Sequence, residues 1–96
     1  MNTKIYYINE HGLGVLKGTL ERLKVAEKET EDKETIATHV LYSFVCGQNR
    51  QRAGRAMTSG DYIEFEDGEI WVCCMRGHKA TEKSPAHKAA NWTVLK

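Results

Sequence analysis

The stretch GRAMTSGDYIEFEDGEIWVCCMRGH, residues 54–78, carries the strongest local folding signals of the chain. Alternating apolar and polar residues lie on both sides of Asp67-Gly68. An Asp-Gly pair between two such runs is the strongest short-range signal for a β-hairpin, because its turn needs positive φ angles. The sequence therefore predicts strands over residues 61–66 and 69–75, joined by a tight turn.

A two-residue loop at Asp67-Gly68 sets a definite register, with residue 66 opposite residue 69. One face then pairs Phe65 with Ile70, Ile63 with Val72 and Asp61 with Cys74, and the other pairs Glu64 with Trp71 and Tyr62 with Cys73. Neighbouring residues of a strand point to opposite faces, so Cys73 and Cys74 cannot easily share a metal ion. We expect Cys74 in the core and Cys73 on the other face.

An apolar stripe with three-to-four-residue spacing predicts one helix over residues 34–47. Its apolar members are Ile36, Val40, Leu41, Phe44 and Val45. Glu34 and Thr35 stand at its start and Gly47 at its end, as is typical of helix boundaries. We expect this helix to pack on one face of the sheet.

β-Branched and aromatic runs predict further strands at residues 4–9 and 92–95. Because residues 5–8 are all large and largely apolar, we expect both faces of the first strand to be covered. Residues 15–25 fit either a helix or a strand, and Gly18-Thr19 favours the strand.

Three polar segments are predicted to lie outside the sheet. The charged run at residues 27–34 contains no apolar side chain, which is typical of a solvated connector or of an exposed helix end. The basic run at residues 48–55 is expected to form a solvated loop. Ser84-Pro85 is a good start for one helical turn that reaches Ala90.

The composition indicates one globular domain over residues 1–96. Of the 96 residues, 41% are hydrophobic and 28% charged, with a net charge of +1. These values argue against a disordered or membrane protein and against general electrostatic binding of nucleic acid. The amino terminus lacks a long apolar run, and three cysteines, two of them adjacent, fit a reducing compartment. We therefore expect a cytoplasmic α+β protein with a small antiparallel sheet and one main amphipathic helix.

Motifs for catalysis or metal binding are missing from the sequence. It has no phosphate loop, dinucleotide fingerprint, serine elbow or His-Glu-x-x-His motif. A cysteine nucleophile at Cys73 or Cys74 has no histidine placed beside it by any specific spacing. We expect no enzyme activity, no cofactor and no metal.

The segment GRAMTSGDYI, followed by a short hairpin that ends in WVCC, resembles the YodL-like domains of small phage and mobile-element proteins. The matching residues are Gly54, Arg55, Met57, Gly60, Asp61 and Ile63, and Thr58 keeps a hydroxyl. Ala56, Ser59 and Tyr62 depart from the family pattern, and Cys73, Cys74 and Met75 replace its later part. The resemblance covers residues 34–78. It implies an accessory protein that binds and inhibits a host protein, for example a CRISPR effector or another defence component.

Aromatic and arginine side chains are enriched at interface hot spots, which motivates a binding role for part of this surface. The candidate partner-binding residues are Arg50, Arg52, Arg55, Tyr62, Glu64, Trp71 and Arg76. An alternative is that a second helix or the tail buries Trp71. An exposed sheet edge also allows a homodimer.

A second hypothesis makes the chain a binder of nucleic acid or of a nucleotide signal. In this hypothesis Arg50, Arg52 and Arg55 contact the phosphates, and Tyr62 or Trp71 stacks on a base. The basic run contains no aromatic residue of its own, which weakens this hypothesis relative to protein binding.

Overall fold

A computed structural model of the chain describes residues 1–74 and 92–95. Arg76 and the helical turn expected before Ala90 lie outside the described residues. The elements are β1 (Thr3–Ile8), β2 (Gly14–Leu20), β3 (Lys24–Val25), β4 (Lys28–Glu29), α1 (Lys33–Val45), α2 (Asn49–Ala53), β5 (Tyr62–Phe65), β6 (Ile70–Cys73) and β7 (Trp92–Leu95). The fold is α+β, as the sequence predicts.

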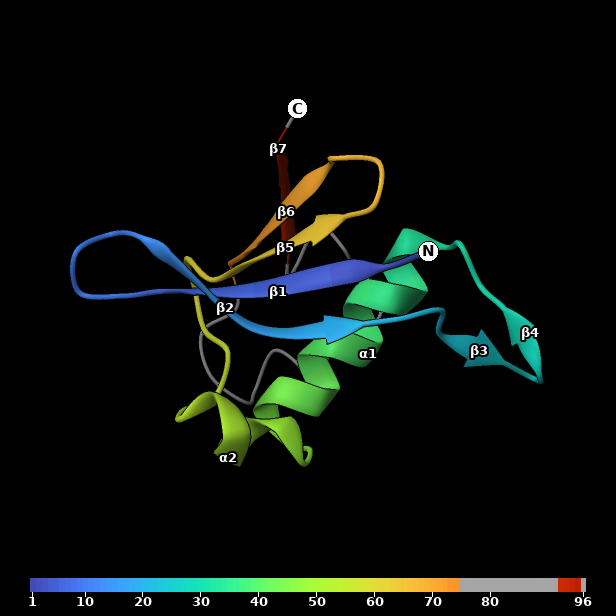
Figure 1. The fold of residues 1–96 in the computed structure, drawn as a ribbon, viewed down its shortest axis with the longest axis horizontal. Helices are drawn as coiled ribbons and strands as arrows, with labels where there is room; N and C mark the ends of the chain where they lie inside the picture. The colour runs from blue at the N-terminus through green and yellow to red at the C-terminus, as the bar shows by residue number, and fades with distance from the viewer. Residues whose placement is uncertain (75–91, 96) are drawn as a thin grey trace.

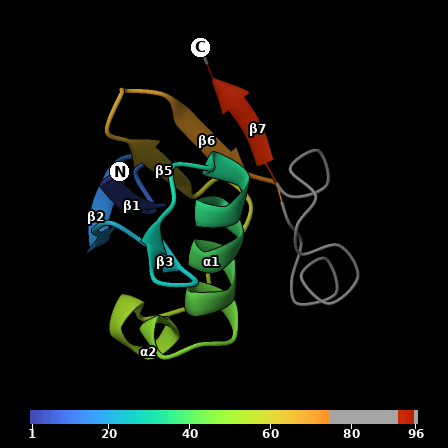
Figure 2. The same cartoon turned by 90° about the vertical axis from the view of Figure 1, so that its right-hand side faces the viewer.

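Five strands form one antiparallel sheet in the order β2-β1-β5-β6-β7. Figures 1 and 2 show α1 running along one face of this sheet. The strand interpretation of residues 15–25 is confirmed as far as Leu20. The charged run at residues 27–34 is mostly exposed, and its last two residues begin α1, which fits the expected exposed helix end. It is not an irregular connector throughout, because β4 pairs with β3 as a small separate hairpin.

The core lies between α1 and the helix-side face of the sheet. The apolar stripe predicted for the helix is buried throughout, with Ile36, Val40, Leu41, Phe44 and Val45 at most 5% exposed. In β1, Thr3, Ile5 and Tyr7 face this core, whereas Lys4 is exposed. The expectation that both faces of the first strand are covered is therefore wrong. Only the side chains that face α1 are fully buried, and those on the opposite face are exposed or partly exposed.

The β5–β6 hairpin has a three-residue loop rather than the predicted two-residue loop. The amide of Phe65 donates to the carbonyl of Glu69, and the amide of Gly68 donates to the carbonyl of Phe65. Gly68 has a φ of 91°, while Asp67 keeps a negative φ, which fits a type I turn followed by a left-handed glycine. Ile63 consequently pairs with Trp71, so the predicted register is wrong by one residue.

The basic run at residues 48–55 is not a loop along its whole length. Residues Asn49–Ala53 form α2, which ends at Gly54 with a φ of 92°. Ala53 is buried against the core, and the amide of Met57 donates to the carbonyl of Phe44. Ala53 therefore anchors α2 in the core, and the Met57 hydrogen bond ties the segment after α2 to the end of α1.

Lys33 connects the start of α1 to the β5–β6 turn. Its ammonium group lies 2.7 Å from the Asp67 carboxylate and 3.2 Å from that of Glu69. The hydrogen bond to Asp67 raises the pKa of Lys33, and the same bond lowers the pKa of Asp67. The indole of Trp71 also donates to Glu69 at 2.7 Å, so one small cluster holds turn, strand and helix together.

The β3–β4 turn provides a first prediction, on stability. Its two central residues, Ala26 and Glu27, have φ angles of 52° and 66°, a conformation that favours asparagine and glycine. We expect the double substitution Ala26→Asn/Glu27→Gly to raise the free energy of unfolding by about 1 kcal/mol. Urea denaturation measures this change.

Gly68→Ala, in the β5–β6 loop, is the opposite change and serves as the control: it replaces a glycine with a positive φ by a residue that disfavours this conformation. Open space surrounds the position where a Cβ would be added at Gly68, so the substitution adds only backbone strain at a φ of 91°. It should therefore lower the stability by a similar amount. Equal stabilities for all three proteins would contradict the assigned turn geometry.

Candidate binding surface

The sheet face opposite α1, here called the outer face, carries two rows of side chains that run across all five strands. No helix covers it in the described part of the chain, as Figures 1 and 2 show. The first row consists of Leu16, Tyr6, Tyr62, Val72 and Thr93. The second row consists of Thr19, Lys4, Glu64, Ile70 and Leu95. Together they form a largely apolar surface with one acid and one base.

Two stacked tyrosines form the middle of the first row. The rings of Tyr6 and Tyr62 lie 4.9 Å apart between centroids, with an interplanar angle of 16°. Tyr62 reaches across β1 as far as β2, since a Cβ added at Gly14 would collide with its hydroxyl oxygen. The glycine therefore leaves room for the tyrosine to lie flat on the sheet, and both rings remain partly exposed.

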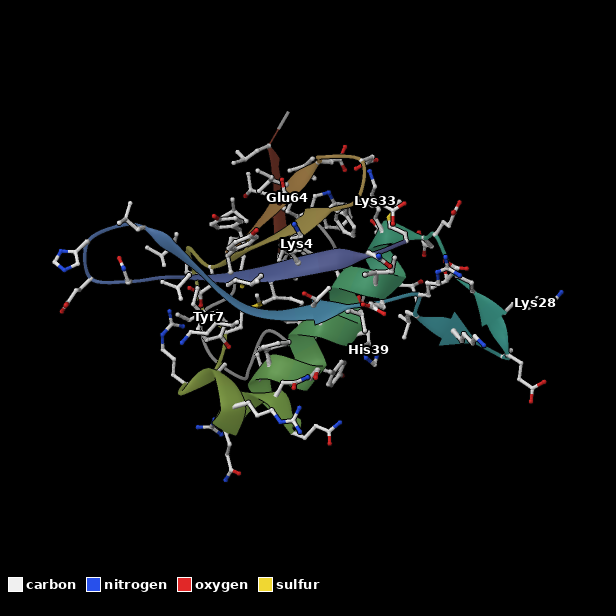
Figure 3. All side chains as sticks on the ribbon, viewed as in Figure 1. Lys4, Tyr7, Lys28, Lys33, His39 and Glu64 are labelled. Carbon is white, nitrogen blue, oxygen red and sulfur yellow. The ribbon has the colours of Figure 1, made fainter. Side chains whose placement is uncertain are left out.

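Lys4 and Glu64 occupy the middle of the second row. They face each other directly across β1 and β5, and Figure 3 shows them next to each other on the sheet. Exposed apolar side chains stand at two ends of the outer face, with Leu16 52% and Leu95 49% exposed. The outer face thus has a charged pair inside an apolar surround.

Trp71 does not belong to this surface. The expectation that it is a partner-binding residue is wrong, and the alternative that it is buried is the one observed. It is 3% exposed and contacts the rings of Phe65 and Trp92 on the helix side. The one-residue change of register is the reason, because such a shift moves every side chain of a strand to the opposite face. Cys73 is buried and Cys74 exposed, so their opposite placement is confirmed while the predicted assignment of each is wrong.

Arg55 is likewise occupied within the fold. Its guanidinium donates two hydrogen bonds to Asp61, at 2.6 and 2.9 Å. Asp61 is only 1% exposed. Its carboxylate also accepts hydrogen bonds from the backbone amides of Ile8, at 3.0 Å, and Thr58, at 2.9 Å. Asp61 therefore joins β1 to the segment before β5, and Arg55 neutralises its charge.

Tyr7 completes this cluster from the core side. The guanidinium of Arg55 lies 4.3 Å from the centroid of the Tyr7 ring, and the Tyr7 hydroxyl donates to the Arg55 carbonyl at 3.1 Å. Burial, and then the nearby charge of Asp61, raise the pKa of Tyr7 to about 12. Hydrogen bonds to Asp61 raise the pKa of Arg55. All these contacts favour a structural role for Arg55.

The remaining predicted residues lie in separate places. Tyr62 and Glu64 share the outer face, whereas Arg50 and Arg52 lie exposed on α2, on the helix side. The structure therefore does not bring the arginines together with Tyr62, the arrangement that the nucleic-acid hypothesis needs.

Sequence reasoning missed Tyr6, Leu16 and Val72. The exposure of Tyr6 could have been predicted from Lys4. Residues 4, 6 and 8 share one face of a strand, and a lysine among them indicates that this face meets solvent. Leu16 could not be placed from the sequence, because its face depends on a β-bulge between residues 16 and 18.

Other kinds of site find little support in residues 1–74 and 92–95. No group of three or more histidine, cysteine or acidic residues in this part could hold a metal ion. The three cysteines, all within it, form no disulfide. Neither described helix has the length and apolar character needed to cross a membrane.

Comparison of the chain with protein-family models, with curated proteins and with solved structures finds no match. The YodL-like resemblance therefore stays a prediction. Its six matching positions have structural roles here: left-handed Gly54 and Gly60, the ion pair Arg55–Asp61, and buried Met57 and Ile63. The six matching positions thus describe how this segment folds, and none of them lies on the outer face, whose Tyr62 is one of the departures from the pattern.

Proposed function

We propose that the chain is a non-enzymatic binding protein that docks on a partner protein through its outer face. The observation that carries this proposal is the pair of rows across the five strands, with stacked tyrosines at the centre. Interface cores are enriched in aromatic side chains, and extended exposed apolar patches mark interaction sites. The matching partner surface is apolar and presents an acid to Lys4 and a base to Glu64.

The resemblance to YodL-like domains supports a more specific form of this proposal. In that form the protein is a phage or mobile-element accessory factor, and its partner is a host defence protein in the cytoplasm that it inhibits. This form rests on the resemblance alone, while the docking surface rests on the fold.

Charged substitutions on the outer face test the proposal. The wild-type chain serves as bait in lysates of candidate host cells, and a retained protein is then purified for quantitative binding. We expect Val72→Glu and Leu16→Glu each to weaken that binding at least tenfold, about 1.4 kcal/mol. Both side chains are partly or largely exposed, so the variants should remain folded.

Gln51→Glu is the matched control, because it adds the same charge at an exposed position of α2 on the helix side. It should bind like the wild type. Wild-type affinity in both outer-face variants would contradict the proposed surface. Light scattering tests whether the outer face binds a second copy of the chain instead. If the wild type is a dimer and Val72→Glu is a monomer, the partner is a second copy rather than a different protein.

A further inference from the structure

A second surface with a different chemistry lies on the helix side, at the edge of the sheet. A hollow of about 210 Å³ opens between β2 and the two helices. Its polar and charged lining residues include Lys17, His39, Ser43, Asn49 and Arg52. None of its lining residues is acidic, and we call this hollow the cationic groove.

A β-bulge places Lys17 in the cationic groove. Ile5 pairs with Gly18 while Tyr6 pairs with Leu16, so Lys17 is the extra residue of β2. Its ammonium group lies 6.0 Å from the ring centroid of Tyr7, which is a helix-side residue. In a regular strand Lys17 would face the outer side, opposite Tyr6. Bulges commonly redirect a side chain in this way at functional sites.

The charges of the cationic groove are not balanced within the fold. Lys17 and Arg52 form no ion pair with any residue that the structure describes, whereas Lys33 and Arg55 each have carboxylate partners. The whole chain carries a net charge of only +1, so two unbalanced cations in one hollow are a local feature. A cleft lined by charges of one sign concentrates ions of the opposite sign.

Polar groups beside the two cations suit an oxyanion. The side-chain amide of Asn49 donates to the Ser43 hydroxyl oxygen at 2.6 Å, which leaves the hydroxyl hydrogen of Ser43 to donate elsewhere. Figure 3 shows His39 projecting from α1 below β2, toward the same edge. Arginine and lysine together are the usual cations of phosphate sites.

We propose that the cationic groove binds the phosphate group of a small phosphorylated ligand. Its volume is below the roughly 300–1,000 Å³ of sites that enclose drug-sized molecules, so it fits one charged group rather than a base and sugar. Single-stranded nucleic acid is disfavoured, because its binders combine cations with stacking rings and the Tyr6–Tyr62 stack lies on the opposite face. This proposal is independent of the docking surface.

Titration of the isotope-labelled chain with inorganic phosphate and pyrophosphate, followed by NMR at constant ionic strength, tests the site. We expect saturable shifts at the Gly18 amide and the Arg52 side chain, and weaker effects with acetate. Lys17→Gln and Arg52→Gln should each weaken pyrophosphate binding at least tenfold. Arg50→Gln, on the same helix but outside the lining, should bind like the wild type.

Two results would overturn the phosphate site. Equal loss of pyrophosphate binding in Arg50→Gln and Arg52→Gln would show diffuse attraction, and equal shifts with acetate would show no preference for phosphate.

A mononucleotide and a short single-stranded oligonucleotide separate the ligand classes. Oligonucleotide binding far tighter than that of the mononucleotide, and weakened by Tyr62→Ala, would replace the small ligand with nucleic acid. Val72→Glu should leave phosphate binding unchanged, which separates this site from the outer face.

Discussion

Asp61→Ala is expected to lower the free energy of unfolding by about 3–5 kcal/mol, a large part of the roughly 5–15 kcal/mol of a typical domain. The carboxylate accepts four hydrogen bonds, two from Arg55 and one each from the amides of Ile8 and Thr58. Alanine leaves those donors without their acceptor at a buried position. Thermal and urea denaturation, followed by circular dichroism, measure the loss.

A double-mutant comparison separates the ion pair from the backbone contacts. Arg55→Met alone leaves a buried carboxylate without its cation and should also be strongly destabilising. The pair Arg55→Met/Asp61→Ala removes both charges, so it should be more stable than the sum of the single changes predicts. Recovery remains partial, because the amides of Ile8 and Thr58 still lack an acceptor. Wild-type stability in Asp61→Ala would contradict this account.

Arg55 also shows the limit of choosing binding residues by type. An arginine in a basic run indicates an exposed cation, and its side chain is in fact 42% exposed. Its partner, Asp61, is six residues away, and only the folded loop brings the two together. Substitution of Arg55 would therefore reduce binding through loss of folding, and it is a poor probe of the docking surface.

The predictable parts of the fold are those with local causes. The helix over residues 34–47 follows from apolar spacing and is observed over Lys33–Val45. The hairpin at Asp67-Gly68 is also correct as an element. Its register was not predictable, because Asp-Gly suits both two-residue and three-residue loops, and Asp67 is held by Lys33, a residue far away in the sequence.

The unpredicted elements lack such local signals. The strands β3 and β4 have two residues each and no apolar alternation, so their sequence is typical of a connector. Only Ala53 of α2 is buried, which leaves no periodic stripe to read. The bulge at Lys17 had one available signal, because a glycine inside a strand, here Gly18, often marks a bulge or a close approach.

Trp71→Ala is the second substitution with a large expected effect, and it distinguishes the core from the docking surface. Trp71 packs edge-to-face on Phe65 with ring centroids 5.2 Å apart, and its ring centroid lies 6.3 Å from that of Trp92. Truncation of such a buried ring should lower the free energy of unfolding by about 3–5 kcal/mol. Because Trp92 belongs to β7, amide exchange over Trp92–Leu95 should accelerate as well.

Two further variants, one at residue 71 and one at residue 72, show whether the loss of stability in Trp71→Ala comes from the buried ring. Trp71→Phe keeps an aromatic ring but removes the indole donor to Glu69, so it should cost clearly less than alanine. Val72→Ala changes the adjacent residue on the outer face, and a partly exposed position should lose much less stability than Trp71. If Trp71→Ala were as stable as Val72→Ala, the observed register would be wrong and the tryptophan would lie on the outer face. With the observed register, loss of partner binding in folded Val72→Glu reports on the docking surface, whereas the same loss in Trp71→Ala reports on the core.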